Sequence, residues 1–153
     1  MILSIVICSY NRASYISEAL NSLYAQTAGL NFFETIIVDN NSSDNTADVF
    51  KNWRASHTNG SFSYLTETKQ GASFARNTGA AAAKGQWLCF MDDDAIANSN
   101  YVENIIKHIE TKPAVVGFGG RIIPKYIPAE PKWMSYYVSS LVCLLYTSPS
   151  PRD

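Results

Sequence analysis

Three consecutive carboxylates are the strongest chemical signal in this sequence. Asp92, Asp93 and Asp94 directly follow a mostly apolar run over residues 86–91. Adjacent carboxylates repel one another unless a cation or hydrogen-bond donors compensate their charge. A small hard cation such as Mg²⁺ or Mn²⁺ can take one such carboxylate, water molecules and two oxygens of a diphosphate ligand. A solvated turn or an acidic helix start would explain the triplet equally well on its own.

Two other positions carry side chains that suit a nucleotide. Asp39 ends the apolar run at residues 36–38 and could accept a hydrogen bond from a uracil imide or a ribose hydroxyl. Asp39, Asn40 and Asn41 are also common turn formers. Arg76 follows a helix start whose free amide donors and positive dipole end favour a phosphate, although an ordinary surface arginine explains it equally well.

Alternating strands and helices must position these side chains. Near-continuous apolar runs are typical of parallel strands that are covered on both faces. Such runs predict strands over residues 3–8, 34–38, 62–65, 86–91 and 114–118. Strand then helix, repeated along the chain, predicts an α/β fold with a mainly parallel sheet flanked by helices.

The helices are predicted between these strands from apolar stripes and capping residues. One stripe over residues 16–24 follows a Ser14 N-cap. Another over residues 102–109 follows Asn100, and Glu103 is placed to complete a capping box. The remaining two helices are predicted over residues 45–53 and 71–83, with Gly85 ending the second.

Polar loops follow three of the predicted strands. In a parallel sheet, ligands bind where strands end at their carboxyl edges, near the switch in strand order. Residues 9–12, 39–44 and 92–94 all lie at such ends. The sequence therefore predicts that these three loops converge on one rim of the sheet.

The composition fits one globular domain without a strong charge bias. The 153 residues are 46% hydrophobic and carry a net charge of −1, so neither nucleic acid nor an anionic membrane is favoured as a partner. Residues 2–7 are too few to span a bilayer and lack a basic leader, which favours a cytoplasmic protein. The widely spaced Cys8, Cys89 and Cys143 indicate reduced thiols, and the first two are expected to be small core residues.

Four short segments occur in a characteristic order along the chain. They are CSYNR at residues 8–12, IVDNNSSD at 37–44, GASFARNTG at 71–79 and FMDDD at 90–94. This order resembles glycosyltransferase family 2, from residue 2 to about residue 141. The resemblance implies a GT-A fold, a Rossmann-like α/β domain, and an inverting, hexosyltransferase-like enzyme that uses a nucleoside-diphosphate sugar, usually UDP-linked, with Mg²⁺ or Mn²⁺.

The resemblance also implies roles for individual residues. Carried over by position, Ser9 and Tyr10 would line the base pocket. Asp39 would bind the uracil or ribose, and Arg76 would contact the nucleotide. The aspartate triplet looks like the family's DxD element: Asp92 and Asp93 belong to the donor site, with Asp93 toward the ribose, and Asp94 is the leading metal ligand.

The end of the sequence differs in character from the rest. Residues 142–153 show no periodicity and finish in a proline-broken run, so we interpret them as a non-native or disordered tail after a domain at residues 1–141. In this family an acidic base from a later segment deprotonates the acceptor hydroxyl. No segment here matches it, so no catalytic residue is assigned, and we expect this truncated chain to bind the donor but to be inactive by itself.

The sequence leaves the identity of the sugar and of the acceptor open. By resemblance, the acceptor would be a carbohydrate or a lipid-linked molecule. Membrane association of the full-length protein, at the inner face of the membrane, is also left open.

Three other interpretations share some of these features. A sugar nucleotidyltransferase would use the same fold class and a metal-binding aspartate, but residues 9–12 stand where it has a Gly-rich phosphate loop. A receiver-like signalling domain expects acidic residues after the first strand and a lysine after the last, and neither is present. A nucleotide-binding remnant without turnover is the third.

Overall fold

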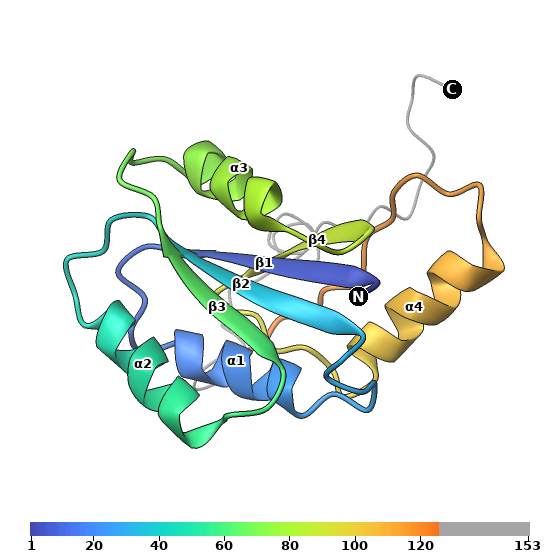
Figure 1. Cartoon of the computed structure of the whole chain (residues 1–153), viewed down its shortest axis with the longest axis horizontal. Helices are drawn as coiled ribbons and strands as arrows, with labels where there is room; N and C mark the ends of the chain where they lie inside the picture. Colours follow the sequence, from blue (N-terminus) through green and yellow to red (C-terminus); the bar gives the residue numbers. More distant parts are fainter. Residues whose placement is uncertain (126–153) are drawn as a thin grey trace, which may run out of the picture. The chain divides into compact units, whose positions relative to one another are not determined.

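The computed structural model describes residues 1–125, and the chain divides into two compact units, Met1–Pro113 and Ala114–Asp153. The first unit contains the helices and strands of the described residues (Figure 1). The second unit is described over residues 114–125, which form neither helix nor strand. The expected domain at residues 1–141 and tail at residues 142–153 extend beyond the described residues.

Parallel strands form the sheet of the first unit, in the order β3-β2-β1-β4. Their bounds are β1 (Leu3–Ser9), β2 (Phe33–Asp39), β3 (Ser61–Thr66) and β4 (Trp87–Asp92). Because β1 pairs with both β2 and β4, Ser9 lies beside Asp39 and Cys8 lies beside Asp92. The carboxyl ends of these strands therefore meet. The predicted α/β class and the convergence of the three polar loops on one rim are confirmed.

Helices cover both faces of the sheet, with α1 and α2 on one face and α3 on the other (Figure 1). Their bounds are α1 (Ile16–Tyr24), α2 (Thr46–Ser56), α3 (Ala72–Ala82) and α4 (Tyr101–Thr111). The larger core cluster joins the sheet to helices α1, α2 and α4 through Leu3, Ile5, Ile7, Leu20, Phe50 and Val102. A smaller cluster of Val6, Ile36, Val38 and Ala75 lies under α3.

The Ser14 cap and the capping box predicted for the last helix are wrong, whereas the predicted position of the Asn100 cap is confirmed. α1 begins after Tyr15 rather than after Ser14, and no side chain caps it. Asn100 is the N-cap residue of α4, but its side chain caps no amide. Glu103 instead accepts a hydrogen bond of 2.7 Å from the hydroxyl of Thr27, in the loop that follows α1. A tertiary partner has therefore replaced the local capping box.

The predicted strand over residues 114–118 is also wrong, because these residues form no strand. An apolar run indicates burial rather than a particular backbone conformation, and a strand also needs a neighbour that accepts its backbone hydrogen bonds. Gly85 does not end α3, whose last residue is Ala82. It passes so close to β1 that a Cβ atom there would lie 2.6 Å from backbone atoms of Leu3 and Ser4.

Both described cysteines are free and partly buried. Cys89 packs against the larger core cluster and Cys8 against the smaller one, as expected of small core residues. Cys143 lies outside the described residues. Within residues 1–125, no helix is both long and apolar enough to cross a membrane.

Thr35 carries a buried hydroxyl beside the larger core cluster, and its replacement tests what that hydroxyl costs. It is fully buried on β2 between Ile5 and Phe62, and its hydroxyl has no hydrogen-bond partner among the described residues. A buried polar group without a partner costs about 1–3 kcal/mol. We therefore expect Thr35→Val to raise the free energy of unfolding by about 1 kcal/mol in urea denaturation. A decrease would show that the hydroxyl has a partner in solution.

Candidate functional site

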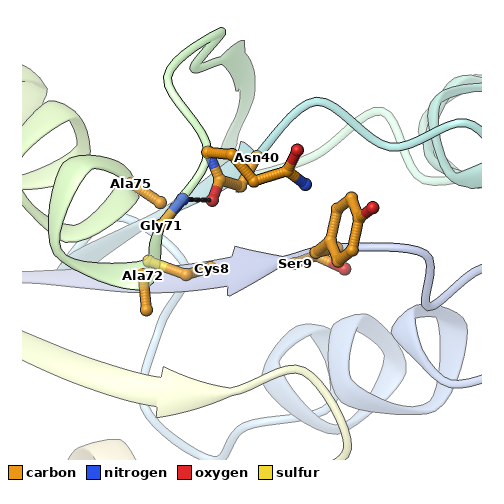
Figure 2. Close-up of a pocket in the computed structure, with 8 residues that line it drawn as sticks. Cys8, Ser9, Asn40, Gly71, Ala72 and Ala75 are labelled. Carbon is orange, nitrogen blue, oxygen red and sulfur yellow. Dashed lines mark hydrogen bonds between the residues drawn. The ribbon is translucent and has the colours of Figure 1, made fainter.

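An open pocket of about 290 Å³ lies at the carboxyl end of β1 (Figure 2). Its walls come from the end of β1, the end of β2 and the start of α3, and are formed by Cys8, Ser9, Tyr10, Asn40, Gln70, Gly71, Ala72 and Ala75. Of the predicted site residues, Ser9 and Tyr10 line this pocket. A site at the carboxyl edge of a parallel sheet is where ligands bind in such folds.

The end of β1 is joined to the aspartate triplet by a hydrogen bond. The Ser9 hydroxyl donates to Oδ2 of Asp93 over 2.8 Å, and Nε of Arg12 lies 4.0 Å from Oδ1 of the same carboxylate. Asp93 is buried, and this burial raises its pKa while the Ser9 hydrogen bond and the charge of Arg12 oppose the rise. Asp93 therefore links the loop after β4 to the end of β1 and to the loop that follows β1.

The outer two aspartates of the triplet have a different environment. Asp92 and Asp94 are exposed, and neither carboxylate accepts a hydrogen bond from another described residue. Among residues 1–125, no three acidic, thiol or imidazole side chains gather into a complete metal site. Exposed carboxylates suit a hard cation whose remaining ligands are water and the phosphates of a bound molecule. The donor set thus fits a metal that arrives with its ligand.

Asp39 has two partners that the sequence did not indicate. Its Oδ1 accepts a hydrogen bond of 3.0 Å from the amide of Ser42, and its Oδ2 accepts one of 2.8 Å from the hydroxyl of Tyr64 on β3. Burial, followed by the bond to Asp39, raises the pKa of Tyr64 well above its usual range. Asp39 is buried, and each of its carboxylate oxygens has a second acceptor position that these two bonds leave unused.

The loops after β1 and β2 hold each other in place. Asn11 has a positive φ of 53°, and its side-chain oxygen accepts from the amide of Ser43 over 2.8 Å and that of Asp44 over 3.3 Å. In return, Asp44 accepts from the amide of Ala13 over 3.1 Å. These contacts hold the loop after β1, which begins with Tyr10, against the loop after β2.

Arg76 is exposed on α3 and does not itself line the pocket. Burial raises the pKa of the Cys8 thiol, and the positive charge of Arg76 is the largest effect that opposes this rise. Arg76 therefore acts electrostatically on the pocket wall at Cys8. The structure thus joins Ser9 to Asp93 by a hydrogen bond and places Ser9 and Tyr10 in the pocket wall, while Asp39 and Asp92 end the strands on either side of β1.

Asn40 is one of two residues at the site that the sequence did not indicate. It was grouped with turn formers, yet its buried side chain holds the loop before α3 and forms part of the pocket wall (Figure 2). Tyr64 was missed as well, because only the pairing of β2 with β3 places it beside Asp39. Neither residue carries a local signal that would have separated it from an ordinary loop or strand residue.

Comparison with known proteins gives a family match over most of the chain. Glycosyl transferase family 2 matches residues 4–144. Validoxylamine A glucosyltransferase from Streptomyces hygroscopicus subsp. jinggangensis is 32% identical over 119 residues, which cover 77% of this chain and 28% of that protein.

Two solved structures resemble the chain. S. aureus TarS 1-349 in complex with UDP has a TM-score of 0.68 at 26% identity, over 82% of this chain and 38% of that one. Mannosyltransferase PcManGT from Pyrobaculum calidifontis, in complex with GDP-Man and Mn²⁺, has a TM-score of 0.67 at 27% identity, over 70% of this chain and 32% of that one. The chain therefore spans about a third of the length of each of these three proteins.

Proposed function

The chain belongs to glycosyl transferase family 2 and has a GT-A type α/β fold, and we propose that its first unit binds the UDP part of a UDP-linked sugar. The observation that carries the proposal is the pocket at the end of β1, with Tyr10 and Asn40 in its walls and Asp39 at the end of the neighbouring strand. The solved relative TarS was crystallised with UDP, which supports this choice of nucleotide.

We assign the base of the nucleotide to the pocket and to Asp39. The pocket walls at Cys8, Ala72 and Ala75 are apolar, which suits the faces of a planar ring. Asp39 would accept the imide N–H of uracil with the acceptor capacity left by Ser42 and Tyr64. Because the hydroxyl of Tyr64 and the amide of Ser42 each bind one carboxylate oxygen, the carboxylate is held in one orientation before the ligand arrives.

We assign the diphosphate to the region between the start of α3 and the aspartate triplet. The amides of Ala72 and Ser73 have no hydrogen-bond partner among the described residues, and Arg76 lies one turn further along the same helix. Asp94 would hold Mg²⁺ or Mn²⁺, which would neutralise part of the charge of the diphosphate. The buried Asp93 would face the ribose while Ser9 keeps its carboxylate in place.

The proposed reaction is sugar transfer with inversion. The oxygen of an acceptor hydroxyl would form a bond to the anomeric carbon as the bond from that carbon to the diphosphate breaks; UDP would leave, and the hydroxyl proton would pass to a general base. The acceptor would be a carbohydrate or a lipid-linked molecule. We assign the donor side of this reaction to the described residues, and we assign none of them as the base.

Asp39→Asn tests the proposal that Asp39 binds the uracil of the nucleotide. A carboxylate accepts from the imide of uracil, whereas cytosine presents an acceptor at the matching edge, so the parent chain should prefer UDP over CDP and ATP. The substitution should weaken UDP binding about tenfold, since a hydrogen bond to a charged group is lost. Calorimetry with UDP, CDP and ATP in the presence of Mn²⁺ measures both effects.

Tyr64→Phe is the matched comparison for this experiment. It keeps the carboxylate and removes only the hydroxyl that orients it, so its loss of UDP affinity should be smaller than that of Asp39→Asn. Unchanged UDP affinity in a folded Asp39→Asn chain would show that Asp39 is only a turn residue. Equal affinity of the parent for UDP and ATP would contradict the proposed nucleotide.

A further inference from the structure

We propose that Asn40 is a positioning residue: it sets the geometry of the loop at residues 67–71 and of the start of α3, and so keeps the pocket shaped for a nucleotide. This inference rests on the proposed function for the identity of the ligand. Its structural basis is independent of that function and lies in the contacts of one buried side chain.

The backbone at Asn40 is fixed from both sides of β2. The amide of Asn40 donates to the carbonyl of Ser9 over 2.8 Å, and the carbonyl of Asp39 accepts from the amide of Glu67 over 2.8 Å. These bonds continue the pairing of β2 with β1 and with β3 beyond the strand ends. Asn40 is therefore a rigid point between the β1 end and the loop that follows β3.

The side-chain amide of Asn40 uses this rigid point to hold the loop. Its nitrogen donates to the carbonyl of Lys69 over 2.6 Å and to that of Glu67 over 3.2 Å, and its oxygen accepts from the amide of Gly71 over 2.7 Å. Asn40 is buried, with 5% of its surface exposed. A hydrogen bond in such surroundings competes little with water, so the three bonds act as one clamp on the loop backbone.

The clamp ends at the residue that turns the chain into α3. Gly71 has a φ of 137°, a conformation that glycine adopts readily and other residues rarely do. Its carbonyl accepts from the amides of Phe74 and Ala75, so the orientation of Gly71 sets the first turn of the helix. Ala72 and Ala75 of that turn form the wall of the pocket opposite Ser9 (Figure 2).

The side-chain contacts of Glu67 also hold this loop, closer to the surface. Glu67 accepts from the amide of Lys69 over 2.7 Å and from the hydroxyl of Thr78 on α3. Glu67 is half-exposed, so water can replace these bonds more easily than those of Asn40. Loss of the Asn40 side chain should therefore release the loop without unfolding the sheet.

Asn40→Ala should weaken nucleotide binding by lowering the fraction of molecules whose pocket is ready. If the loop adopts the binding geometry only about a tenth of the time, the apparent affinity falls about tenfold. Amide hydrogen exchange should also rise at Gly71 and across residues 67–71, because the amide of Gly71 loses its acceptor. Calorimetry with UDP and Mn²⁺ and exchange measured by mass spectrometry give the two readouts.

Gln26 provides a closely matched control. Its buried side-chain amide also donates to two carbonyls, those of Ser22 and Asn98, and accepts from an amide at the start of a helix, that of Val102. It does not line the pocket. Gln26→Ala should destabilise the fold to a similar extent, yet change UDP affinity less than about twofold and leave exchange at residues 67–71 unaltered.

UDP binding by the parent chain tests the proposed function, and the difference between the variants tests the role of Asn40. If the parent chain binds no UDP, the proposed function and the ligand of this inference both fail. If the parent binds UDP, equal affinity in Asn40→Ala and Gln26→Ala overturns the inference alone, as does unchanged exchange at residues 67–71. Should Asn40→Ala not fold, Asn40→Asp replaces it, because a carboxylate still accepts from Gly71 but cannot donate to Glu67 and Lys69. Unchanged exchange and affinity in that variant overturn the inference as well.

Discussion

Removal of divalent ions should weaken UDP binding to this chain by about 10- to 100-fold, the size of a typical coupling between two bound species. Without a cation, the diphosphate would approach the carboxylates of Asp92, Asp93 and Asp94 with its charge uncompensated. Calorimetric titration with UDP in Mn²⁺ and in chelator measures the effect. By thermodynamic linkage, UDP must raise the affinity for Mn²⁺ by the same factor, which a metal titration with and without UDP checks.

Asp94→Ala should abolish this metal dependence and leave the weak, metal-independent affinity. Asp48→Ala is the matched control, because Asp48 is an exposed aspartate in the first turn of α2 and should change UDP affinity little. Equal UDP affinity with Mn²⁺ and with chelator would contradict a metal site at the triplet. If UDP binding still depends on the metal in Asp94→Ala, a residue other than Asp94 coordinates the metal.

Gly79→Val should destabilise the fold by about 3 kcal/mol, at the upper end of what overpacking usually costs. Gly79 lies where α3 packs closely on the sheet: a Cβ atom there would lie 2.3 Å from Cγ1 of Val6 and 3.1 Å from Cγ2 of Val38. Both valines are fully buried and have stiff side chains, so neither can move aside. α3 would have to lift away from the sheet. Urea denaturation measures the loss.

Ala81→Val is the control for the intrinsic cost of valine in a helix. Ala81 lies in the same helix but is exposed, so this variant should lose only about 0.5 kcal/mol, the propensity difference. Similar losses in the two variants would show that α3 does not pack against Val6 as closely as the structure indicates.

The sheet could be predicted from the sequence because its signal is local. The central strands β1 and β2 are buried on both faces and are nearly continuous apolar runs, and the helices between the strands carry apolar stripes. Predicted and observed elements agree to within a few residues for each of these strands and helices. The same rule failed over residues 114–118, where apolar character occurs without a strand.

The candidate site could be predicted only in part. The order of the polar loops placed Ser9, Tyr10, Asp39 and the aspartate triplet on one rim, and the strand order confirms this placement. The family resemblance assigned different roles to the three aspartates, but the triplet by itself could not show that Asp93 alone is held by Ser9, which lies 84 positions away along the chain. Nor could the sequence identify Asn40, whose partners lie 27 to 31 positions away.

The family, the succession of elements and the types of side chain at the rim of the sheet could be predicted from the sequence, because each is encoded in short segments. The tertiary structure decided which of those side chains are bound and which are free: Asp93 is held by Ser9, Asp92 and Asp94 face solvent, and Asn40 clamps the loop before α3. The physical reason is that strands and helices follow from periodicity within a segment. A side-chain hydrogen bond depends instead on which distant segments the sheet brings within about 3 Å of each other.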